Sequence, residues 1–279
     1  MYRVIKVLNN NSVLVLHEAR KKEYILMGNG IGFGKRPGQR LEGVGNARVY
    51  ALVTRQKQQS ALKAVNGIEP IYIEATAKII DIAETVFKNI NRDILLPLAD
   101  HIALAAKRAK ENSQIPNPFT SDIRLLFPEA FEIAQKGKTV LKEKTGYELS
   151  DDEAGFIALH IHAGIGGGRA ADTLDATRIT EECMQIIENH FKMRLQKDYH
   201  GYRQLLSHLY DMLARTQKDE PINVDLNDFV WERYPEAADA AAQVCAYMET
   251  QLGKLVLKDE IGFLAIHIQR TISKNKGEK

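Results

Sequence analysis

DEAGFIALHI at residues 152–161 and DEIGFLAIHI at residues 259–268 are two versions of one decapeptide, and they decide the fold. Asp152 and Asp259 are 107 residues apart. The same offset, without a gap, pairs His101 with His208, His160 with His267, Arg108 with Arg215, Phe127 with Tyr234 and Gly146 with Gly253. Internal repetition at a fixed spacing indicates two copies of one structural module.

Each copy has the residue pattern of an all-helical bundle. In the first copy, apolar residues recur at three- and four-residue spacing from Ile79 to Ile90, and residues 98–108 and 152–162 continue the helical pattern. Ser150 or Asp151 is placed to cap the last of these helices. The glycine-rich segment 164–168 predicts a flexible border, so we expect one domain at 68–170 and its homologue at 172–279.

Residues 1–57 read instead as a small antiparallel β-sheet. Short segments rich in β-branched or large apolar residues alternate with turn residues, and they predict strands at 4–8, 12–17, 23–27 and 47–53. So small a sheet has a marginal core, and pairing with a second copy would bury another face. The polar segment 54–67 predicts a linker. The predicted fold class is therefore multidomain α and β, with a β-sheet head before two homologous helical bundles.

The distribution of charge also changes between the head and the helical copies. Residues 1–55 hold ten Lys/Arg against three Glu, a net +7, whereas the other 224 residues hold 28 basic and 33 acidic groups, a net −5. A basic head on a mildly acidic body is typical of a nucleic-acid binder with a separate control region, although a short basic segment can also be plain solvated surface.

Two cysteines in 279 residues fit a reducing cytosol rather than a disulfide framework. The N-terminal residues lack the apolar region of a signal peptide, and no apolar run is long enough to span a membrane. We therefore expect a cytoplasmic protein.

The glycine-rich segment 28–35 (GNGIGFGK) matches neither phosphate-binding motif. A P-loop requires glycine where Asn29 stands and Ser or Thr where Arg36 stands, and the dinucleotide fingerprint requires a βαβ unit. The glycines would let the backbone approach a partner, with Phe33 stacking on a base. A simple β-turn with a core Phe is equally consistent with this segment, and for Asn9–Asn11 a hairpin turn is the simpler interpretation.

The four repeat-matched histidines are the candidate regulatory residues. A lone histidine in an apolar helix is usually a core residue, but two matched pairs favour a function. A near-neutral imidazole can attack phosphorus, and the phosphohistidine formed adds negative charge that can make or break an interface. Arg108 and Arg215 follow their histidines by seven residues and would share a helix face with them. A metal site is less favoured, because the second copy has Ser207 where the first has Asp100.

Together these features resemble the BglG/LicT/SacY family of bacterial transcriptional antiterminators, over essentially the whole chain. IKVLNNNSVLVL and ILMGNGIGFGKRPG look like the family's co-antiterminator RNA-binding domain at 1–57. ADHIALAAKR, IPNPF and DEAGFIALHIHAG look like its first phosphotransferase-regulated domain, and LLSHLYDMLAR with DEIGFLAIHIQR like its second. Asn29 departs from the family, where several members carry Arg, and His162 is an additional histidine.

The resemblance implies a mechanism. A dimeric head would bind a leader-RNA hairpin that excludes a terminator, through residues at family contact positions: Lys6, Asn9, Asn11, Gly28 and Phe33. A sugar-specific phosphotransferase permease would inhibit through His101 and His160, and the phosphocarrier HPr would activate through His208 and His267. The resemblance implies no enzyme activity, no cofactor and no metal. The alternative is a metal-dependent hydrolase that uses the paired histidines.

Overall fold

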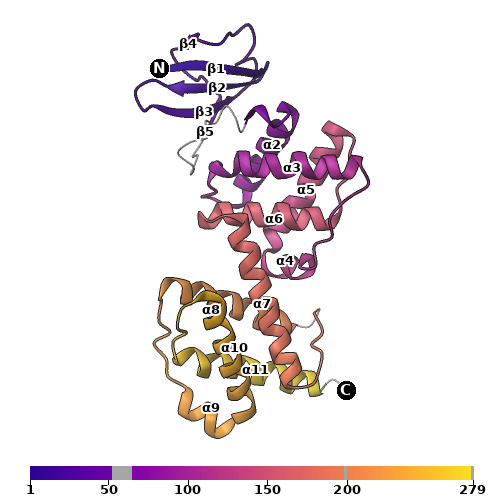
Figure 1. Cartoon of the computed structure of the whole chain (residues 1–279), viewed down its shortest axis with the longest axis vertical. Coiled ribbons are helices and arrows are strands. Elements are labelled where there is room, and N and C mark those ends of the chain that lie inside the picture. The colour runs from indigo at the N-terminus through magenta and orange to yellow at the C-terminus, as the bar shows by residue number, and fades with distance from the viewer. Residues whose placement is uncertain (52–64, 198–199, 278–279) are drawn as a thin grey trace. The chain divides into compact units, whose positions relative to one another are not determined.

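The computed structural model describes residues 1–51, 65–197 and 200–277 and forms two compact units (Figure 1). Unit 1 contains residues 1–120 and 127–170, and unit 2 contains residues 121–126 and 171–279. Unit 1 therefore holds the β-sheet head together with most of the first helical copy. The short segment 121–126 belongs to the first copy by sequence but packs within unit 2.

The head is a five-stranded antiparallel sheet with the order β4-β1-β2-β3-β5. Its strands are β1 (Tyr2–Asn9), β2 (Ser12–His17), β3 (Lys22–Met27), β4 (Arg40–Leu41) and β5 (Arg48–Ala51). The four predicted strands are confirmed as β1, β2, β3 and β5. The two-residue β4, which pairs with the start of β1, was not predicted, because so short an edge strand carries no alternation of apolar residues.

Both faces of this sheet carry buried apolar residues within unit 1. One face forms a core of Val4, Val13, Val15, Tyr24, Leu26 and Leu41. On the other face Leu14, Ile25 and Tyr50 are cross-strand neighbours, and each is 0% exposed. The guanidinium carbon of Arg92, from the helical part of unit 1, lies 5.8 Å from the centre of the Tyr50 ring. Leu14, Ile25 and Tyr50 on the second face are thus buried in the single chain, and pairing of the head with a second copy stays a prediction.

The helical part of unit 1 contains α2 (Pro70–Val86), the 3₁₀ turn η1 (Arg92–Ile94), α3 (Leu95–Lys110), α5 (Pro128–Thr145) and α6 (Asp151–Gly166). The Ser150 side chain caps α6 by accepting a hydrogen bond from the Glu153 amide. Gly167 ends α6 in the left-handed conformation. The predicted flexible break at 164–168 is therefore wrong for residues 164–166, which form the last turn of α6, and the chain leaves the helix only at Gly167. Most of the predicted linker lies outside the described residues, but Val65 and Asn66 are helical and Val65 is buried.

Unit 2 repeats the bundle with α7 (Ala170–His190), α8 (His200–Lys218), α9 (Asn227–Arg233), α10 (Pro235–Leu252) and α11 (Asp259–Gly277). Its core also receives most of α4 (Thr120–Leu126). The carboxylate of Asp122 on α4 is buried, and it accepts hydrogen bonds from Lys197 at 2.7 Å and Tyr202 at 3.1 Å. Among the described residues, no helix is long and apolar enough to cross a membrane.

Candidate functional sites

The first histidine pair lies between α3 and α6. His101 on α3 and His160 on α6 have ring centroids 5.3 Å apart, with the rings inclined by 40°. The Phe156 ring, one turn before His160 on α6, lies 5.7 Å from the His101 ring. The two histidines predicted from the repeat are therefore neighbours in space, in an aromatic and partly buried setting.

A buried ion pair stands beside this histidine pair. Arg108 Nε and Nη2 each donate a hydrogen bond of 2.9 Å to the carboxylate of Glu153, which is 0% exposed. The Nε2 atom of His101 is 3.3 Å from the same carboxylate, without the geometry of a hydrogen bond. Burial raises the pKa of Glu153, but His101 and Arg108 together lower it by more than burial raises it. The pKa of Glu153 therefore lies below its ordinary value. The site thus holds a negative charge next to His101.

The second copy has the same parts in a different arrangement. His208 on α8 and His267 on α11 stack with ring centroids 4.2 Å apart and an angle of 11° between the rings. Arg215 donates to Glu260 at 2.9 and 3.0 Å, as Arg108 does to Glu153. The His208 Nε2 atom is buried and has no hydrogen-bond partner within the described part of the chain. The two copies are therefore equivalent in composition but not in the geometry of their imidazoles.

Burial favours the neutral form of three of these imidazoles, those of His160, His208 and His267. It lowers the pKa of His160 to about 3, with a further contribution from His101, and lowers the pKa of His208 to about 3, with contributions from His267 and Arg215. Burial and then Arg270 also lower the pKa of His267. A neutral imidazole has a free lone pair on one ring nitrogen. The neutral ring is therefore the form that attacks phosphorus.

His162 is not part of the first histidine pair. Its ring stacks on Phe127 with 3.9 Å between centroids, and burial lowers its pKa to about 4. It therefore has the character of a residue packed into the helical bundle.

Sequence reasoning missed four residues that line the histidine pairs. The signal was present, because each lies in the duplicated decapeptide at the 107-residue offset: Glu153 with Glu260, and Phe156 with Phe263. No group of three or more His, Cys, Asp or Glu among the described residues could hold a metal ion. The hydrolase alternative therefore has no candidate metal centre in that part of the chain.

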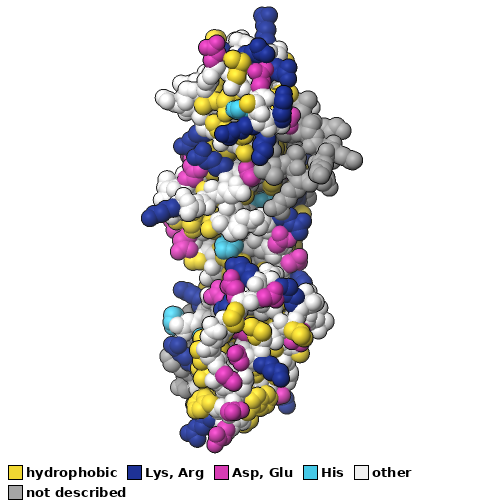
Figure 2. Space-filling view, turned by 90° about the vertical axis from the view of Figure 1, so that its left-hand side faces the viewer, with side chains coloured by type: hydrophobic (Ala, Val, Ile, Leu, Met, Phe, Trp, Pro, Cys, Tyr) yellow, Lys and Arg dark blue, Asp and Glu magenta, His cyan; other side chains and the backbone are white. Residues whose placement is uncertain are grey.

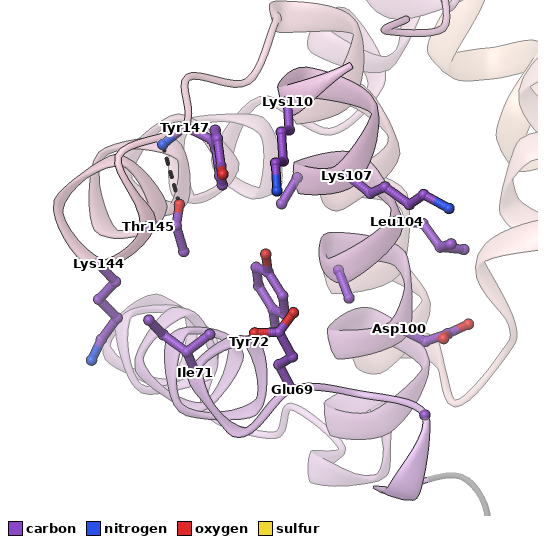
Figure 3. A pocket seen from close by; sticks show the side chains of 13 residues that line it. Glu69, Ile71, Tyr72, Asp100, Leu104, Lys107, Lys110, Lys144, Thr145 and Tyr147 are labelled. Carbon is purple, nitrogen blue, oxygen red and sulfur yellow. Dashed lines mark hydrogen bonds between the residues drawn. The ribbon is translucent and has the colours of Figure 1, made fainter. Parts of the chain in front are cut away.

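A cavity of about 520 Å³ lies in unit 1 at the start of α2, along α3 and at the end of α5 (Figure 3). Neither histidine of the first pair lines it. Figure 3 shows the Tyr72 hydroxyl directed into the cavity, whereas Asp100 and Lys107 lie along its α3 side. The cavity is thus separate from the histidine pair, although Asp100 and His101 are adjacent in sequence.

In the head, the glycine segment folds onto the Asn9–Asn11 turn. The amide of Gly28 donates to the Asn11 carbonyl at 2.9 Å, and the amide of Gly30 donates to the Asn11 side chain at 3.0 Å. A methyl group on Gly32 would come within 2.1 Å of the Asn9 carbonyl oxygen, so only glycine permits this approach. Turn and glycine segment thus form one structure, which we call the turn–loop surface (residues 9–11 and 28–34).

This surface brings together most of the predicted RNA-contacting residues. Asn9, Asn11 and Gly28 lie in it directly, and the Phe33 side chain is 72% exposed. The interpretation of Phe33 as a core residue is therefore wrong. Lys and Arg side chains are frequent over the head on the face shown in Figure 2.

Lys6 and Asn9 share the sheet face that carries Leu14 and Tyr50. Register shifts in β1 between Val4 and Lys6 and between Val7 and Asn9 place both side chains there. Asn9 Oδ1 accepts hydrogen bonds from the Asn11 amide and the Ser12 hydroxyl. The asparagine amide is thereby oriented with its Nδ2 donor directed away from the turn.

Comparison with known proteins assigns the three parts of the chain. Residues 2–59 match the CAT RNA binding domain, and residues 77–164 and 181–271 each match the PRD domain. The chain is 28% identical to the transcription antiterminator LicT of Bacillus subtilis (strain 168), over 97% of this chain and 99% of that protein. It is 27% identical to a beta-glucoside operon antiterminator of Dickeya chrysanthemi, over 97% of both.

A solved structure supports the fold of unit 1. The crystal structure of GlcT CAT-PRDI is 33% identical to this chain and aligns with a TM-score of 0.50. The alignment covers 59% of this chain and 98% of that one. The likeness thus extends over almost the whole of a protein that joins a CAT and a first PRD domain.

Proposed function

Because the chain belongs to the family of transcriptional antiterminators that join a CAT RNA-binding domain to two PRD domains, it acts in antitermination at sugar operons, and we propose how its residues do so. The head stabilises a leader-RNA hairpin that excludes a terminator. The histidine pairs receive phosphoryl groups from the sugar phosphotransferase system. The proposed domains are 1–57, 68–170 and 172–279.

The observation that carries the RNA-binding proposal is the turn–loop surface. Asn9, Asn11 and Gly28 come from separate strand ends and meet there, with Phe33 exposed beside them. Asparagine side chains pair with base edges and ribose hydroxyls, exposed aromatic rings stack on bases, and lysine neutralises phosphate. We assign RNA contact to these four residues and to Lys6.

Regulation follows from the chemistry of the imidazoles. A ring nitrogen of His101, His160, His208 or His267 attacks the phosphorus of a phosphorylated donor side chain. The new P–N bond forms as the bond between phosphorus and the donor side chain breaks, and that side chain leaves. We propose HPr as donor for the second pair and a sugar-specific permease for the first.

The new charge would act on the neighbouring ion pair. A phosphoryl group on His101 Nε2 would lie against the Glu153 carboxylate, which is 3.3 Å from that atom, and like charges repel. Arg108 is already within reach of the same carboxylate and would be drawn to the phosphoryl group. Phosphorylation thus supplies a local force for rearranging α3 against α6.

Three further assignments concern enzyme activity, cellular location and oligomeric state. We propose that the protein is a non-enzymatic regulator that works in the cytoplasm as a homodimer. The relatives are named as antiterminators, which supports a regulator over the hydrolase alternative.

The test is a titration of the full chain with the hairpin from the leader upstream of its own gene, at two salt concentrations. Scrambled RNA and duplex DNA are the controls. Hairpin-selective binding with moderate salt dependence is expected. Equal and steeply salt-dependent binding to all three nucleic acids would contradict the proposal, because it would mean that the head supplies only nonspecific phosphate attraction.

A further inference from the structure

The side chains proposed to contact RNA are already bound to another part of the same unit. Asn9 Nδ2 donates a hydrogen bond of 2.6 Å to the carboxylate of Glu74, on the second turn of α2. Lys6 Nζ donates at 2.6 Å to the side chain of Asn66, just before α2. Two of the five residues therefore have their donors occupied within the chain.

Further contacts join the head to the same side of α2. Arg48, on β5, forms an ion pair with Asp81 and lies 4.0 Å from Glu84. Glu74, Asp81 and Glu84 follow one another at spacings of seven and three residues, so they form an acidic stripe on one side of α2. Residues 1–55, at +7, are the strongly basic part of the chain, and this stripe offers them fixed carboxylates.

The turn–loop surface faces this stripe across a cavity. Asn11 and Gly28 line one side of a cavity of about 430 Å³, and Glu74 and Asp81 line the other. A hairpin that approached Asn11 and Gly28 from this side would meet α2, whose Glu74 and Asp81 line the cavity together with Lys78 and Lys144. A carboxylate also offers Asn9 the same kind of hydrogen-bond acceptor as a base carbonyl or a ribose hydroxyl.

Resting on the proposed function, we propose that α2 competes with RNA for the head. In the arrangement described here the acidic stripe holds Asn9 and Arg48 while Asn66 holds Lys6, and the head reads RNA only after it separates from α2. The affinity for RNA is then reduced by the fraction of molecules in the closed arrangement. Weakening the contact should raise that affinity without adding any contact to RNA.

The experiment measures affinity of the full chain for the leader hairpin by fluorescence anisotropy. Glu74→Ala removes the acceptor for Asn9, and Asn66→Ala removes the acceptor for Lys6 without changing net charge. We expect Glu74→Ala to bind the hairpin about fivefold more tightly than wild type, and Asn66→Ala about twofold more tightly. These factors correspond to the free energy that a partly exposed hydrogen bond or ion pair contributes.

Glu129→Ala is the matched control, because it removes the same charge as Glu74→Ala at a distance from the head. Glu129 is in the first turn of α5, whereas Lys144, which approaches Glu74, is in the last turn of that helix. It should bind the hairpin as wild type does, and circular dichroism should show equal helix content in all variants. If the chain binds the hairpin but Glu74→Ala and Asn66→Ala match wild type, the competition is wrong and the proposed function stands. If no variant binds the hairpin, both fall.

Discussion

At the scale of single residues, burial is the main cause of the lowered pKa of three histidines, ahead of any neighbouring charge. His160, His208 and His162 all have pKa values lowered first by burial, to about 3, 3 and 4. For His162 the neutral ring stacked on Phe127 is a packing element, so its protonation opposes folding. Buried neutral histidines make a protein sensitive to mild acid.

His162→Phe should reduce the acid sensitivity of unit 1. In wild type, the unfolded histidine binds a proton below its ordinary pKa of about 6.5, whereas the folded one does so only near pH 4. Stability is therefore full above pH 6.5 and is lost as the pH falls towards 4. Urea unfolding at pH 7.5 and 5.5 should show a loss about 1 kcal/mol smaller in the variant than in wild type. An equal loss in both proteins would refute the buried neutral state.

At the scale of elements, the ion pairs link the histidine-bearing helices. Arg108 on α3 holds Glu153 on α6, and Arg215 on α8 holds Glu260 on α11. In each case the carboxylate is almost fully buried and the arginine is partly exposed. Each pair is a polar contact between the two helices whose histidines face each other, so it fixes their alignment.

Glu153→Gln should destabilise unit 1 by about 3 kcal/mol, because it leaves the partly buried Arg108 without a counter-charge. Thermal or urea unfolding of the full chain measures this. The comparison variant is Glu132→Gln on α5, which breaks only an exposed pair with Lys136 and should leave the transition unchanged. Similar behaviour of the two variants would show that the buried pair does not hold α3 to α6.

The elements also show what the sequence could and could not predict. The 107-residue repeat implies that both copies place their histidines alike, and the structure has His101 beside His160 and His208 beside His267. Contact within each pair was not predicted, because a repeat relates the two copies to each other and not the helices within one copy. The repeat cannot predict that one pair is inclined and the other stacked, since ring orientation depends on packing. Nor could it predict that 121–126 packs in unit 2, because the apolar residues that carry that contact would suit either core.

The same limit applies to the head. Its strands follow from short alternating segments, but the function of the glycine segment could not be decided from composition. Its close approach to the Asn9 carbonyl and the exposure of Phe33 depend on tertiary contacts. The contact of Asn9 with Glu74 joins residues 65 positions apart, with no local signal for it in either segment.

At the scale of the whole molecule, the proposed phosphorylations should act with opposite sign in the two copies. His101→Asp places a carboxylate near Glu153 and should lower terminator readthrough, and His208→Ala removes an activating acceptor and should also lower it. We expect changes of about fivefold or more, the usual size of a regulatory coupling. A readthrough reporter in cells measures both.

His200→Ala is the control for that reporter, because His200 is exposed on α8 and its counterpart at the repeat offset is Asp93. Readthrough should match wild type in this variant. Readthrough equal to wild type in both His101→Asp and His208→Ala would exclude control through these histidines.

The close approach at Gly32 also bears on how such a head diverges during evolution. The atom that excludes a side chain at position 32 is the backbone carbonyl of residue 9, which every amino acid has. Replacing Asn9 therefore changes what the turn can recognise without relaxing the demand for glycine opposite it. If Asn9 and Phe33 contact RNA as proposed, substitutions there would change the RNA target, whereas Gly32 should stay glycine in relatives that bind different targets.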